Sequence, residues 1–171
     1  MRDHAHHADS VVFGDPQHAA SDSARRLASA NPDLFLLERL LDEYAGLDFL
    51  ADELTGRKNV EIRGTAWRHN RGEHARIAEL RQALADAFHQ RYEMQPGREL
   101  RELAESIAAL PSKSQQRQAL DGVLVESHTR KLILIEAMYP RLRNSDVRAA
   151  IDRTRARLQE EVGKLAARAA H

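Results

Sequence analysis

Five carboxylate or imidazole side chains interrupt faces of this sequence that are otherwise apolar. They are Glu43, Glu73, His74, His128 and Glu161. Each falls in an arc of Leu, Ile or Ala side chains when successive residues are placed 100° apart around a helix. Because carboxylates and imidazoles are good ligands for Fe, Mn and Zn, the pattern predicts a transition-metal site between helices.

A salt-bridged polar layer is the alternative interpretation of the same residues. Glu43 lies at the rim of its arc, where it can pair with Arg or His across a helix interface. Arg81 lies at a depth similar to that of Glu161 and is a candidate partner for it. Burial of a charge is costly without compensation, so these carboxylates require either a metal or an opposite charge.

No catalytic or nucleotide-binding motif accompanies these residues. Ser127 and His128 are adjacent on a helix, so they point in different directions and cannot form a nucleophile–base pair. The sequence also has no glycine-rich phosphate loop. The pattern therefore assigns no reaction and leaves open whether the protein is an enzyme.

Composition excludes several classes of protein. The chain has 171 residues, no Cys, and 26 basic against 26 acidic residues. This length fits one domain, and the zero net charge gives no basic field for nucleic acid or anionic membranes. The lack of Cys excludes a disulfide framework. No apolar run is longer than Leu132–Ile135 and none follows the N terminus, so we expect a cytoplasmic protein without membrane spans.

Hydrophobic periodicity predicts four long amphipathic helices and one short helix. The long helices are expected at 31–54, from 60–66 to 92, at 114–139 and at 144–169, and the short helix at 98–110. Asn31-Pro32 is a favourable helix start, and Pro140 a stop. The similar lengths and short links predict an all-α, antiparallel four-helix bundle, with the short helix between the second and third long helices.

Residues 1–30 lack this periodicity and are rich in His. We therefore expect a mobile tail at 1–30 and a bundle domain at 31–171. The tail is either a solvated arm or a weak binding site for a transition metal, since neutral imidazole ligates such metals.

Three segments resemble those of the ferritin-like four-helix domains of unknown function that are common in bacteria. They are Glu73-His74-Ala75-Arg76, Glu126-Ser127-His128-Thr129-Arg130-Lys131 and the turn Leu142–Arg148. The resemblance covers residues 34–166. It implies a bacterial ferritin-like bundle, with Glu160-Glu161 standing where the family has a His on its last helix.

Two functions are consistent with these patterns. The first is a ferritin-like bundle that binds Fe, Mn or Zn through its inward Glu/His cluster. The alternative is a non-enzymatic interaction or adaptor protein that binds a protein partner or a second copy of itself. An exposed patch of large apolar side chains would favour the alternative, and the single apolar side of the helix at 98–110 is a candidate for it.

Overall fold

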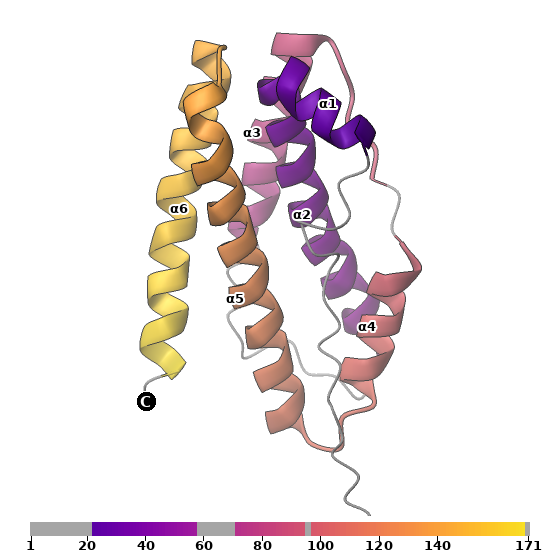
Figure 1. Ribbon diagram of the computed structural model, residues 1–171. Helices are drawn as coiled ribbons and strands as arrows, with labels where there is room; N and C mark the ends of the chain where they lie inside the picture. The colour runs from indigo at the N-terminus through magenta and orange to yellow at the C-terminus, as the bar shows by residue number, and fades with distance from the viewer. Residues whose placement is uncertain (1–21, 58–70, 95–96, 170–171) are drawn as a thin grey trace, which may run out of the picture.

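The protein is all-helical throughout the residues described by the computed structural model, which are 22–57, 71–94 and 97–169. These ranges hold no β-strand, as predicted. Their helices, drawn in Figure 1, are α1 (Asp22–Ala30), α2 (Pro32–Thr55), α3 (Arg71–Phe88), α4 (Arg98–Ala108), α5 (Lys113–Met138) and α6 (Ser145–Ala169). A 3₁₀ turn at Tyr139–Arg141 follows α5.

Side-chain caps fix the starts of three helices. The side-chain oxygen of Asn31 accepts a hydrogen bond from the backbone N of Leu34 at 3.2 Å, and Pro32 begins α2. Ser112 caps α5 in the same way, and Asn144 caps α6. Each cap satisfies backbone N–H groups that lack a partner within the helix. The predicted starts at 31, 114 and 144 lie within two residues of these caps.

The four long helices pack around a shared interior. α2 contacts α3 and α5, and α6 contacts the same two helices (Figure 1). The carboxylate of Asp33, at the start of α2, accepts hydrogen bonds from the backbone N of Arg143 and of Asn144. The starts of α2 and α6 therefore lie at the same end of the molecule as the end of α5.

Helix α1 was not expected. The sequence predicted a tail through Ala30, but residues 22–30 form a helix that packs on α2, with Leu27 and Ala28 against the core. Leu27 is the one large apolar residue of Asp22–Ala30, which is too few to give a helical period, so the prediction was wrong for this stretch. Residues 1–21 lie outside the described residues.

Helix α3 ends earlier than the apolar pattern indicated. It stops at Phe88 rather than Tyr92, and His89 adopts a φ of 56°, a left-handed conformation that terminates a helix. Tyr92 nevertheless remains attached, because its hydroxyl donates a hydrogen bond of 2.7 Å to Asp42 on α2. The predicted first part of this helix falls at 58–70, outside the described residues.

Helix α4 covers the lower half of α2 and part of α5 (Figure 1). Its apolar side, made of Leu100, Ala104 and Ile107, is buried against the molecule itself. This helix was a candidate for an exposed docking patch. Its apolar side is not exposed, because the chain uses it for its own core.

Candidate functional site: a polar layer between two hydrophobic clusters

The core divides into two hydrophobic clusters along the axis of the helices. The upper cluster joins α2, α3, α5 and α6 and includes Leu40, Leu80 and Leu158. The lower cluster joins α2, α4, α5 and α6 and includes Leu50 and Leu120. Between the two clusters the buried residues of α5 are Ser127, His128 and Lys131, and α6 contributes Glu161. We call this region the polar layer.

Glu43 contributes to the polar layer from α2. Its two carboxylate oxygens accept hydrogen bonds from the Nε and Nη2 of Arg130 on α5, each at 3.3 Å. The Oγ of Ser127, one turn earlier on α5, donates to the same carboxylate at 2.9 Å. Arg130 also reaches Glu126 on its own helix at 2.7 Å. This network neutralises Glu43 with a forked, charge-assisted contact.

His128 contributes to the polar layer on the side of α5 that faces α6. Its Nε2 lies 3.2 Å from Oε2 of Glu161, and the other carboxylate oxygen of Glu161 lies 2.9 Å from Nε of Arg157. The imidazole is buried, with an exposed fraction of 2%. Its Nδ1 is buried as well and has no hydrogen-bond partner among the described residues.

Lys131 is the least expected member of the layer. It is completely buried on α5, and its Nζ lies 3.7 Å from the centre of the Tyr44 ring on α2. A cation over an aromatic face is stabilised by the negative charge density of the ring, and the effect grows when water is excluded. Tyr44 therefore compensates part of the cost of burying this ammonium group.

These surroundings favour the neutral form of His128. Burial lowers the pKa of the imidazole, and the nearby charge of Lys131 lowers it further, whereas the contact with Glu161 opposes both effects. A neutral ring with its proton on Nε2 donates to Glu161 and leaves Nδ1 as a buried acceptor. Protonation would place a second positive charge beside Lys131, in a region that water does not reach.

The structure divides the predicted site residues between two contacts. Glu43 pairs with Arg130 and Ser127 on the side of α5 that faces α2, whereas His128 and Glu161 meet between α5 and α6. Glu73 and His74 belong to the first turn of α3, but their side chains are outside the described set. Within that set, no three carboxylate or imidazole groups gather as a metal site would require.

Glu161 lies level with His128 across the α5–α6 interface. The hydroxyl of Tyr139, just after the end of α5, donates a hydrogen bond to Asp152, seven residues after the start of α6. The first turns of α6 therefore extend beyond the end of α5. The expected partner Arg81 instead lies over the Tyr92 ring, 5.7 Å from its centre. Arg157, one turn before Glu161 on the same helix, takes that role.

Sequence reasoning missed the basic members of the layer. Lys131 and Arg130 were noted only as part of a segment, because long basic side chains usually reach solvent from any position. A signal was present for Lys131, which lies one turn after His128 and one turn before Ile135, within the apolar arc of its helix. The aromatic partner that makes its burial tolerable lies on another helix and has no sequence signature.

The outward face of α5 has the opposite character. Among the described residues, the exposed large hydrophobic side chains are Ile133, with an exposed fraction of 62%, and Val125, with 39%. Exposed Gly122, Thr129 and Ala137 continue the same face. The hydroxyl of Thr129 bonds the carbonyl of Val125 at 2.7 Å, so its hydrogen-bonding capacity is already used. We call these five residues the α5 outer strip.

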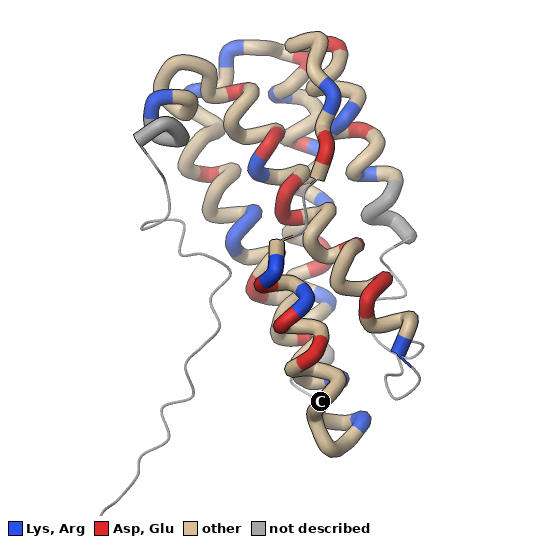
Figure 2. The backbone as a smooth tube through the Cα atoms, turned by 90° about the vertical axis from the view of Figure 1, so that its right-hand side faces the viewer, with Lys and Arg blue, Asp and Glu red and all other residues tan. Residues whose placement is uncertain are grey.

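The comparisons with known proteins give no family. No family model matches the chain, and neither a curated protein nor a solved structure is similar enough to indicate a relationship. In the described ranges, no helix has the length and apolar character needed to cross a membrane. Acidic and basic positions alternate along the helices visible in Figure 2 rather than forming a face of one sign.

Proposed function

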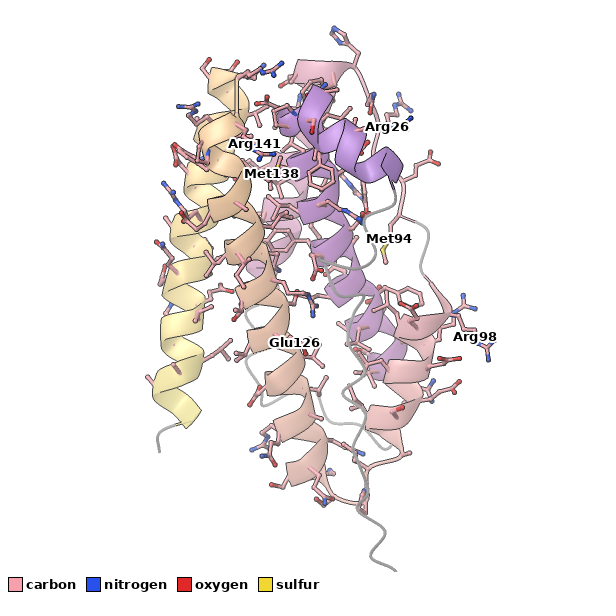
Figure 3. The ribbon with its side chains drawn as sticks, in the orientation of Figure 1. Arg26, Met94, Arg98, Glu126, Met138 and Arg141 are labelled. Atoms are coloured by element: carbon pink, nitrogen blue, oxygen red, sulfur yellow. The ribbon has the colours of Figure 1, made fainter. Side chains whose placement is uncertain are left out.

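We propose that this chain is a helical interaction protein that binds a helical protein segment on the α5 outer strip. The observation that carries the proposal is the 62% exposure of Ile133, on a helix that buries a lysine and a histidine. An exposed apolar strip bounded by polar residues is typical of a binding surface. Figure 3 places Glu126, which borders the strip, near the middle of α5.

The contacts of the polar layer support a structural role for it. Glu43 is matched by Arg130, and Glu161 is matched by Arg157 and His128. Charges compensated in this way hold helices in register without needing a ligand. We place function on the outside of the bundle, where the described elements leave apolar side chains of α5 exposed.

Photochemical crosslinking tests this proposal. A benzoylphenylalanine placed at Ile133 of the full chain, in the cells that produce it, should give a discrete adduct of defined mass. The same group at Ala156, which is exposed on α6, is the matched control and should give little. Thr129→Arg, at the centre of the strip, should remove the adduct. Equal yields at both positions, or none at Ile133, would contradict the proposal.

A metal site in a ferritin-like bundle is a second candidate, which the buried Nδ1 of His128 favours. The ring already meets the carboxylate of Glu161, and ferritin-like bundles hold metal with carboxylate and imidazole side chains from facing helices. Elemental analysis of untagged protein beginning at Asp22 tests it. Stoichiometric Fe, Mn or Zn that falls in His128→Ala would support the site, and metal-free protein whose melting ignores all three ions would remove it.

A further inference from the structure

We infer that the α5 outer strip binds the same strip on a second copy of this chain, in antiparallel orientation. The inference rests on the proposed function and names the occupant of that surface. Two features of the strip support it, namely the order of its side chains and the placement of the charges beside it.

The side chains of the strip are arranged almost symmetrically about Thr129. A β-branched residue stands four positions to either side, Val125 before and Ile133 after. Seven positions from Thr129 stand Gly122 before and the exposed Glu136 after. A two-fold axis through Thr129 would therefore place Val125 against Ile133 of the second copy, and Glu136 beside Gly122 of the second copy, where the missing side chain leaves room for the carboxylate. Such self-complementarity is what an isologous contact requires.

The charges beside the strip are compatible with this orientation. The five residues of the strip carry no charge, and Glu136, which is exposed on the same face, meets the uncharged Gly122 of the second copy rather than a like charge. Glu126 and Arg130 border it on the same side and form an ion pair. Antiparallel packing reverses their order, which brings Glu126 within about 3 Å along the helix axis of Arg130 of the second copy, at 1.5 Å per residue. The two Glu126 carboxylates stay about 9 Å apart along the axis.

The size of the strip sets the strength of the contact. One helical face is smaller than the roughly 800 Å² that each partner contributes to a standard interface. The core of each copy is already buried by its own helices, so folding does not depend on association. We therefore expect a reversible dimer that forms at high protein concentration.

Sedimentation equilibrium of the full chain over a range of concentrations tests the association. The average mass should rise from the 19.3 kDa of one chain toward twice that value. Thr129→Arg brings two guanidinium groups together on the axis and should abolish the rise. Ala156→Arg, which adds the same charge on α6, should leave it unchanged.

Cysteine crosslinking tests the orientation, because the natural chain has no Cys. Under oxidation, Thr129→Cys alone should give a covalent dimer. Val125→Cys alone should give little, whereas its mixture with Ile133→Cys should give a mixed dimer. Equal crosslinking of all three single variants would overturn the antiparallel arrangement.

The outcomes also separate this inference from the proposed function. A chain that stays monomeric up to about 1 mM, where only very weak contacts remain undetected, would overturn the second-copy inference. If the photochemical adduct at Ile133 then contains a different protein, the strip remains a binding surface with another occupant. The absence of every adduct would remove both.

Discussion

Helices α5 and α6 lie side by side with nearly equal lengths, yet they distribute their side chains in opposite ways. α6 buries Val147, Ile151 and Leu158 and leaves most of its arginines at least partly exposed. α5 buries Lys131 and His128 and exposes Ile133 and Val125. The inner arc of α5 still holds enough Leu and Ile to fix its orientation. Its buried polar groups are compensated, Lys131 by the Tyr44 ring and His128 by Glu161.

The difference between the two helices indicates what each contributes, which is stability for α6 and both packing and binding for α5. The pattern on α6 is explained by stability alone. On α5, neither the buried cation nor the exposed isoleucine is explained by hydrophobic burial, which is the main driving force for folding. The inner polar groups fix the packing of α2, α5 and α6, and the outer apolar groups are available for binding.

Truncation of apolar side chains on the two helices should give the largest contrast. Leu158→Ala on α6 should lower the free energy of unfolding by about 2–5 kcal/mol, because it leaves a cavity in the upper cluster. Leu40→Ala on α2 should behave in the same way. Ile133→Ala on α5 should cost less than about 0.5 kcal/mol, since it is exposed. Urea unfolding measures the free energy of unfolding of all three variants. Similar losses for Ile133→Ala and Leu158→Ala would mean that α5 is rotated about its axis so that Ile133 faces the core.

Substitutions of Lys131 should distinguish what its side-chain volume contributes to the free energy of unfolding from what its charge contributes. Lys131→Ala removes a buried side chain and should cost about 2 kcal/mol or more. Lys131→Met keeps most of the volume and removes the charge, so it should stay within about 1 kcal/mol of the natural protein. The same unfolding experiment compares them. A Met variant as unstable as the Ala variant would show that the ammonium group itself stabilises the fold.

The sequence predicted the positions of α2, α5 and α6 well, since each of these helices has an apolar period, and Asn31-Pro32 and Pro140 mark a start and an end. It also identified Glu43, His128 and Glu161 as inward residues. It did not identify Arg130 as the partner of Glu43, because pairing across helices depends on their rotation and axial offset. It missed α1, whose few apolar residues become informative only when α2 is beside them.

Acidification should weaken the α5–α6 side of the layer. The pKa of His128 is lowered in the folded protein, mainly by burial, so the folded state disfavours the protonated ring. The free energy of unfolding should therefore fall as the pH drops below the unfolded pKa of about 6.5, by at most 1.4 kcal/mol per unit. His128→Gln should reduce this slope.

The control for that measurement is His89→Asn, at an exposed position whose left-handed backbone Asn tolerates. It should leave the slope between pH 7.5 and pH 5 unchanged. If His128→Gln and the natural protein lost the same stability on acidification, another group would be responsible for the pH dependence.

Charge on the outer face of α5 should have the smallest effect on stability. Ile133→Glu places a carboxylate in solvent, and its free energy of unfolding should change by less than about 0.5 kcal/mol. Its association, in contrast, should be lost. Melting curves and sedimentation of the same sample make the comparison, and a variant that unfolds readily would show that Ile133 belongs to the core.

The crosslinking yield at position 133, compared between the natural background and Thr129→Arg, tests the central claim about α5 most directly. We predict a discrete adduct in the natural background, its loss in Thr129→Arg, and the same melting temperature for both proteins. An adduct that survives in the folded Thr129→Arg protein would contradict the assignment of the outer strip as the binding surface.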